Sequence, residues 1–105
     1  MVQIINDVKM FRADRAWGAR DLADLAEVTA RLHWTDKPFV WHVNDGVELF
    51  VVSDGQVDMW FKKAGVETCI RLGPSDMFLA ETGDEHVAHP VGEARILIIV
   101  RAGSV

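Results

Sequence analysis

From residue 28 onward, hydrophobic and polar residues alternate with a period of two in short runs separated by turn-forming residues. This pattern is typical of a β-sandwich or a small β-barrel. It predicts strands at residues 28–34, 39–43, 47–53, 56–62, 67–72, 76–80, 86–89 and 94–101. The breaks between them fall at Asp36–Lys37–Pro38, Asp45–Gly46, Asp54–Gly55, Ala64–Gly65 and Gly73–Pro74–Ser75. We therefore expect an all-β fold.

Two of these segments carry sharper expectations. The pair Asp54–Gly55 lies between two β-rich runs, which predicts a tight hairpin at that point. The run from Arg95 to Arg101, RILIIVR, is apolar at consecutive positions. A strand of this kind is expected at the centre of a sheet, covered on both faces.

Residues 1–27 do not share this pattern. Apolar residues at positions 4, 5, 8 and 11 are spaced as in a short amphipathic helix or turn, which Asn6 and Asp7 could cap. Residues 12–20 show no clear period. Residues 21–27 fit a helical turn or a strand, and we interpret this part of the chain as two short strands or a turn and a strand. We expect one domain, 1–105, in which a helix/strand extension (1–27) precedes a barrel (28–101).

The composition supports a globular domain that associates with itself. The chain has 105 residues, of which 50% are hydrophobic and 26% charged, enough for one core. Four Trp and five Phe exceed what a core of this size easily buries, so we expect a homodimer. The net charge of −5, without a basic cluster, argues against nucleic acid and anionic membranes as partners.

Targeting signals and disulfides are not expected. The first ten residues, MVQIINDVKM, mix acidic and basic residues with apolar ones, unlike a secretory signal peptide. The apolar run from Ile96 to Val100 is far shorter than a membrane span. Cys69 is the single cysteine, and its place in the alternating run ETCIRL predicts a small buried hydrophobic residue. We expect a cytoplasmic protein.

The candidate site lies in the stretch from Trp41 to Gly55, WHVNDGVELFVVSDG. On a strand, His42, Asn44 and Glu48 share one face, so their side chains can point to one centre. Imidazole, amide oxygen and carboxylate are all metal ligands. A second polar run, SDMFLAETGDEH, ends in His86, which could supply a fourth ligand from elsewhere in the sheet.

Simpler interpretations of the same residues stay open. His42 and Glu48 could form a buried acid–base pair. Asn44 could be a turn former before Asp45–Gly46, and His86 could be a loop histidine.

Strand parity also predicts where the other histidines and the aromatic residues lie. Strand parity predicts that His33 points to the outer face of its strand and that His89 faces away from His86. Alternation suggests a pocket lining drawn from Phe50, Val52, Met59, Phe78 and Trp34 or Trp60, although most of these residues would simply fill the core.

These motifs resemble the cupin superfamily. Its first motif, G-x5-H-x-H-x3/4-E-x6-G, is matched by His42, Glu48 and Gly55, with Asn44 in place of the second His and Asp36 in place of the first Gly. The second motif, G-D-x-F-x-x-P-x-G-x-x-H, is matched at Asp76, Phe78, Gly83 and His86. Ser75 replaces its Gly, Glu81 replaces its Pro, and Pro90 stands where an Asn usually follows.

The resemblance spans about residues 28–101. Over this range the chain looks like a small stand-alone cupin, loosely related to the mannose-6-phosphate isomerase-like branch. It implies a jelly-roll β-barrel (double-stranded β-helix) with a short N-terminal helical segment. It also implies a divalent metal ion, Fe, Ni, Mn or Zn, held by His42, Asn44, Glu48 and His86 in the barrel mouth. An amide oxygen at position 44 is a weaker ligand than an imidazole, which lowers the expected affinity.

Three functions compete. The first is a metal-dependent isomerase or dioxygenase that acts on a small molecule. The second is a non-catalytic small-molecule-binding or sensor module without metal. The third is an interaction scaffold in which the polar cluster has no ligand. The fold alone does not choose among them, because one fold hosts many activities.

Overall fold

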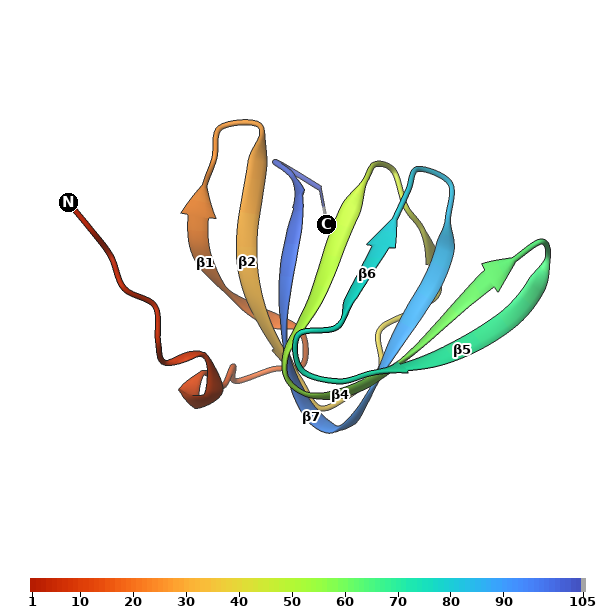
Figure 1. Cartoon of the computed structure of the whole chain (residues 1–105), viewed down its shortest axis with the longest axis horizontal. Helices are drawn as coiled ribbons and strands as arrows, with labels where there is room; N and C mark the ends of the chain where they lie inside the picture. Colours follow the sequence, from red (N-terminus) through yellow and green to blue (C-terminus); the bar gives the residue numbers. More distant parts are fainter. Residues whose placement is uncertain (105) are drawn as a thin grey trace.

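The computed structural model describes residues 1–104 and is almost entirely β-structure (Figure 1). A single turn of 3-10 helix precedes seven strands. These elements are η1 (Val8–Met10), β1 (Gly18–Asp24), β2 (Val28–Thr35), β3 (His42–Val43), β4 (Glu48–Lys63), β5 (Val66–Leu72), β6 (Met77–Ala80) and β7 (Glu85–Arg101). The predicted all-β jelly-roll barrel with a short N-terminal helical segment is confirmed.

The barrel is built around two long strands, β4 and β7. The strands form an antiparallel sheet in the order β1-β2-β7-β4-β5, while β3 pairs with β7 and β6 pairs with β4. β4 and β7 pair from Glu48–Val100 to Phe61–His86. Both strands bend midway, so that their two halves belong to different walls (Figure 1). This bend closes the sheet around an interior.

The predicted hairpin at Asp54–Gly55 is wrong, because residues 48–53 and 56–62 belong to one continuous strand, β4. The pairing of β4 with β7 shifts its register on either side of Asp54, as at a β-bulge. Gly55 has a φ of 81° there, and a Cβ atom on it would lie 2.5 Å from the carbonyl oxygen of Glu93. The glycine thus allows the two bent strands to touch. The tight turn lies instead at Ala64–Gly65, between β4 and β5.

The N-terminal segment is less helical than its spacing suggests. Only η1 forms, and the side chain of Asp7 accepts a hydrogen bond from Arg20 (3.0 Å) rather than capping the helical turn. Residues 18–24 form β1, and a short turn leads from it into β2. β1 lies at an edge of the sheet and is mostly exposed or half-buried, which explains the missing apolar alternation.

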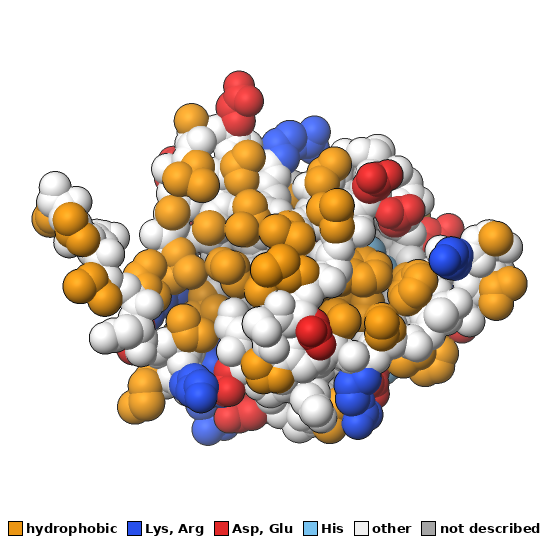
Figure 2. Space-filling model, in the orientation of Figure 1, with side chains coloured by type: hydrophobic (Ala, Val, Ile, Leu, Met, Phe, Trp, Pro, Cys, Tyr) orange, Lys and Arg blue, Asp and Glu red, His pale blue; other side chains and the backbone are white. Residues whose placement is uncertain are grey.

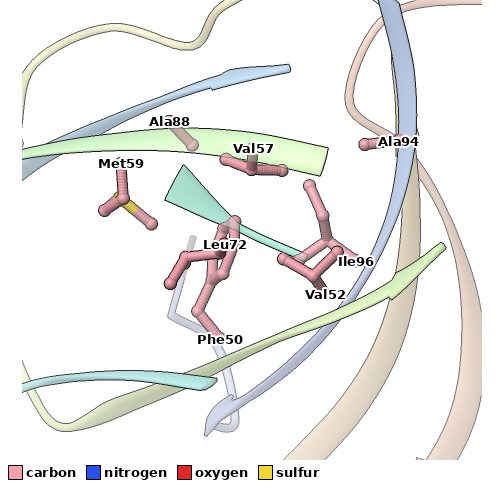
Figure 3. Close-up of a cluster of buried hydrophobic side chains, with 8 residues drawn as sticks. All are labelled: Phe50, Val52, Val57, Met59, Leu72, Ala88, Ala94 and Ile96. Carbon is pink, nitrogen blue, oxygen red and sulfur yellow. The ribbon is translucent and has the colours of Figure 1, made fainter. Parts of the chain in front are cut away.

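The hydrophobic core fills one end of the barrel. Figure 3 shows apolar side chains from both halves of β4, both halves of β7 and the end of β5 meeting there: Phe50, Val52, Val57, Met59, Leu72, Ala88, Ala94 and Ile96. Both halves of each long strand therefore contribute to the same core. Burial of these side chains stabilises the bend, because each would be exposed if the strands were straight.

Two burial predictions need correction. β7 is central, between β2 and β4, as expected, but Leu97 and Ile99 on its outer face are only half-buried. Cys69 is exposed rather than buried. The reason is that β5 is the outer strand of a hairpin that projects from the barrel, and only its last residue, Leu72, is buried (Figure 1).

One outer surface of the barrel is apolar. Leu49 on β4 pairs with Ile99 on β7 and Leu79 on β6, and Val51 pairs with Leu97 and Met77 in the same way. These six positions alternate with inward-facing residues, so they share the outward side. Figure 2 shows hydrophobic side chains gathered over these strands. We call this set the apolar outer face; Met77 is 62% exposed and Leu79 57% exposed.

Candidate functional site

The other end of the barrel holds a cavity of about 370 Å³. Its floor is polar and its walls are mainly apolar and aromatic, with two arginines. It is lined by Arg15, Ala16, Trp17, Ala19, Arg31, His33, Phe39, His42, Glu48, Phe50, His86, Ala88, Ile98, Val100 and Ser104. Its volume lies within the range of small-molecule sites.

Three of the four predicted site residues, His42, Glu48 and His86, line this cavity, and the fourth, Asn44, lies behind them against His86. His42 and His86 are cross-strand partners on β3 and β7, and their ring centroids are 4.3 Å apart. Nε2 of His86 lies 2.8 Å from Oδ1 of Asn44 and 4.0 Å from Oε1 of Glu48. Asn44, Glu48 and His86 are each less than 10% exposed. His86 is therefore a buried strand residue, not a loop histidine.

Backbone hydrogen bonds hold Asn44 against His86. The backbone N–H of Asn44 donates to the carbonyl oxygen of Asp84 (2.9 Å), and the backbone N–H of Gly83 donates to the backbone carbonyl oxygen of Asn44 (2.9 Å). These bonds join the end of β3 to the turn before β7. The side chain of Asn44 also donates from Nδ2 to the carbonyl oxygen of Gly46 (3.3 Å). Asn44 thus acts both in the turn, as one interpretation suggested, and in the site.

These contacts determine which ring nitrogens carry protons. A carbonyl oxygen only accepts, so Nδ1 of His42, 3.0 Å from the carbonyl oxygen of Val40, carries a proton, and in the neutral ring Nε2 is the bare nitrogen. Because Asn44 donates from Nδ2 to Gly46, its Oδ1 accepts, and Nε2 of His86 is the donor. Nδ1 of His86 is then bare; it is buried and has no hydrogen-bond partner within residues 1–104.

The electrostatics of the floor favour uncharged groups. Burial lowers the pKa of His86 to about 4, with a further lowering by His42 and a partial offset by Asp84. Burial raises the pKa of Glu48, while His42 lowers it in part. Desolvation therefore dominates both groups, and the His86 imidazole is neutral at pH 7. An uncharged His86 is consistent with its role as a hydrogen-bond donor to the amide.

The donor set does not fit a three- or four-ligand metal centre. A metal needs a bare ring nitrogen, which His42 offers at Nε2, and a carboxylate, which Glu48 offers. Nε2 of His86 instead carries a proton that it donates to Oδ1 of Asn44, so His86 has no lone pair at Nε2, and Asn44 offers only a neutral oxygen that already accepts one hydrogen bond. Within residues 1–104, no group of three or more His, Cys, Asp or Glu side chains could hold a metal ion.

The walls of the cavity contain residues that the sequence analysis missed. His33 lines the cavity, so its predicted outward orientation is wrong. The opposite side of β2 carries Leu32 and Trp34, which are buried, and Arg12 lies over the ring of Trp34. Both sides of β2 are thus covered, which parity alone does not reveal. Arg31 lies two residues before His33 on β2, so the two side chains share one side of the strand, and the position of one would have predicted that of the other.

Trp17 forms part of the wall in an unusual backbone conformation. Its φ is 63°, in the left-handed region. Its Nε1 donates to the carbonyl oxygen of Lys37 (2.9 Å), and its own carbonyl oxygen accepts from Nδ1 of His33 (2.9 Å). A left-handed non-glycine residue costs of order 1–3 kcal/mol and persists only where its surroundings enforce it. No periodicity in residues 12–20 could have predicted this position.

Comparison with known proteins identifies the fold. No family model and no curated protein matches the sequence. A cupin-2 domain protein from Shewanella frigidimarina is 26% identical, with a TM-score of 0.78 over 93% of this chain and 94% of that chain. A cupin superfamily protein from Desulfitobacterium hafniense is 16% identical, with a TM-score of 0.78 over 96% of this chain and 92% of that one.

An iron enzyme shares the same fold. The hydroquinone 1,2-dioxygenase PnpCD, solved in complex with Fe3+, is 18% identical with a TM-score of 0.74. The match covers 87% of this chain and 29% of that chain.

Within residues 1–104, no helix has the length and apolar character needed to cross a membrane.

Proposed function

Because the chain is a small cupin, we propose that it binds a small organic molecule in the mouth of its barrel, at a polar site that works without a bound metal. The hydrogen bond from Nε2 of His86 to Oδ1 of Asn44 (2.8 Å) carries this proposal. It occupies two of the four groups that would otherwise ligate an ion. The remaining polar residues, His42 and Glu48, line the cavity and are left to contact a ligand.

A second candidate is the metal-dependent isomerase or dioxygenase implied by the motifs. An imidazole nitrogen of His42 and the buried carboxyl of Glu48 favour it, since both are metal-ligand types and both residues line the cavity. The similarity to a dioxygenase that binds Fe3+ also supports it. Binding would require His86 to move its proton to Nδ1 and to release Asn44. The metal, Fe, Ni, Mn or Zn, would then act as a Lewis acid or activate oxygen.

Elemental analysis of untagged protein, purified without chelator, separates the two candidates. We expect less than about one tenth of an equivalent of Fe, Ni, Mn or Zn, because the donor set lacks a third free ligand. Protein treated with EDTA should bind small molecules as well as untreated protein does. About one equivalent of a single metal, lost together with ligand binding in His86→Ala, would establish the metal-dependent candidate instead.

For the assembly, we propose that a second copy of this chain covers the apolar outer face. The six positions of this face carry no charge, whereas the chain as a whole has a net charge of −5. Two copies therefore repel each other least where their uncharged faces meet. A flat apolar face is also complementary to itself, as a two-fold dimer requires.

Charge placed on this face should separate the copies. Leu79→Asp is expected to convert a dimer into a monomer in sedimentation velocity at micromolar concentration, because each interface would then bury two unpaired carboxylates. Val66→Asp is the matched control, since Val66 is 64% exposed but lies on the projecting β5. A wild-type protein that sediments as a monomer would refute the assembly.

A further inference from the structure

We infer that the ligand of this cavity is a small aromatic carboxylate, whose carboxylate binds Arg31 and Arg15 and whose ring packs against Trp17 and Phe39. This inference rests on the proposed function, because it names the ligand class of the same cavity. Four observations support it: the orientation of Arg31, the position of Arg15, the aromatic wall and the local charge.

Arg31 lines the cavity and is paired there with Asp21. It is the cross-strand partner of Ile98, another lining residue, and so shares its side of the sheet. Nε of Arg31 donates to Oδ1 of Asp21 (2.6 Å), and Asp21 is 82% exposed. This ion pair uses only Nε and leaves the two terminal nitrogens of the guanidinium to a ligand. A planar guanidinium presented in this way matches the two oxygens of a carboxylate.

Arg15 adds a second positive charge at the entrance. It lines the cavity, it is exposed, and it takes part in no ion pair within residues 1–104. The carbonyl oxygen of Arg15 accepts from the amide of Gly18 (3.1 Å), which fixes the turn that leads into β1. The turn therefore holds Arg15 beside the cavity rather than leaving it on a free tail.

An aromatic wall runs from the entrance to the floor. Trp17 packs edge-on against Phe39 (5.4 Å between centroids), and Phe39 packs edge-on against His42 (5.3 Å). Two hydrogen bonds hold Trp17 in its strained backbone conformation: its indole donates to the carbonyl oxygen of Lys37, and its carbonyl oxygen accepts from His33. Strain kept at a cavity wall points to a binding role. An aromatic ring can pack against such a wall in the offset-stacked or edge-on arrangements that aromatic pairs prefer.

The charge of the lining is opposite to that of the protein. The chain carries 16 acidic and 11 basic residues, Lys and Arg together, yet the lining has two arginines and one acid, Glu48. Asp21 is paired with Arg31 beside the cavity, so Arg15 is the positive charge of the lining that has no carboxylate partner within residues 1–104, and the lining is less acidic than the protein as a whole. Its volume of about 370 Å³ suits a single ring with its substituents.

Binding of benzoate and benzamide, which have the same shape but different charge, tests the ligand class. Titration followed by two-dimensional NMR should show benzoate shifting the indole signal of Trp17, with benzamide binding about tenfold or more weakly. Arg31→Gln should weaken benzoate binding by about tenfold or more and leave benzamide unchanged. Arg71→Gln is the matched control, because Arg71 pairs with Asp58 on the projecting hairpin, away from the cavity. Its affinity for benzoate should equal that of the wild type.

Other outcomes distinguish a wrong ligand class from a wrong proposed function. If benzamide binds as tightly as benzoate and Arg31→Gln changes neither, the anionic class is wrong while a small-molecule site remains. If inorganic phosphate competes as well as benzoate does, the aromatic ring contributes nothing and the assignment also fails. If neither aromatic compound nor phosphate shifts signals of Trp17, Phe39 or His42, and a broad panel of small polar molecules also fails, both the ligand class and the proposed function are overturned.

Discussion

Replacing Asn44 by His is expected to create a metal site where the wild type has a hydrogen-bonded cluster. The substitution removes the acceptor that holds the proton on Nε2 of His86, so that this nitrogen becomes able to ligate. It also adds a third imidazole beside His42 and the carboxyl of Glu48. We expect the affinity for Zn2+ or Ni2+ to rise on the order of 100-fold.

Isothermal titration with Zn2+ and Ni2+ on chelator-treated protein measures this gain. Asn44→Ala is the control, because it removes the acceptor without adding a ligand and should gain far less affinity than Asn44→His. Thermal unfolding of each variant without metal checks that the buried position, 6% exposed, accepts the larger ring. A wild type that binds Zn2+ as tightly as Asn44→His would show that Asn44 does not prevent metal binding.

Gly55→Ala is expected to cause the largest loss of stability, about 3 kcal/mol or more in the free energy of unfolding. Gly55 has a φ of 81°, which an alanine adopts only at a cost. The added Cβ would lie 2.5 Å from the carbonyl oxygen of Glu93 and 3.1 Å from Cα of Ala94. Both are backbone atoms of β7, so relief requires the two long strands to separate at their bend.

Gly65→Ala is a matched control for the backbone term alone. Gly65 has a similar φ of 78°, but nothing lies within 4 Å of a Cβ atom placed there. We expect this variant to lose about 1–2 kcal/mol, the cost of the left-handed conformation. Denaturant unfolding of both variants gives the difference that belongs to the close approach of β4 and β7. Equal losses would mean that the contact at the bend is not restrictive.

The close approach at Gly55 also explains where sequence reasoning failed on the fold. Alternation located the strand segments, because each buries one side against the core. An Asp–Gly pair, however, serves equally in a tight turn and in a bulge. The choice depends on the partner strand: both halves of β4 pair with β7, whose paired residues are 25 or more positions away in the sequence. No local pattern contains that information.

The site was partly predictable for a related reason. His42, Asn44 and Glu48 were expected on one strand face, but His42 lies on β3, Asn44 follows β3 and Glu48 begins β4, so they meet through the pairing of two strands and not through parity along one. That His86 joins them rested on the motif and is now explained by the pairing of β3 with β7. The hydrogen bond that protonates Nε2 of His86 depends on how Asn44 is turned, which spacing cannot reveal. Trp17 escaped detection because its position depends on a left-handed residue in a segment without periodicity.

The histidine side chains report the central claim most directly, through long-range ¹H–¹⁵N correlation spectra recorded with and without an equimolar amount of Zn2+. The proposed site predicts His86 protonated at Nε2 and His42 protonated at Nδ1, with neither pattern changed by the metal. A His86 that is unprotonated at Nε2, with both rings shifting together when Zn2+ is added, would contradict the metal-free site and establish a metal centre at the mouth of the barrel.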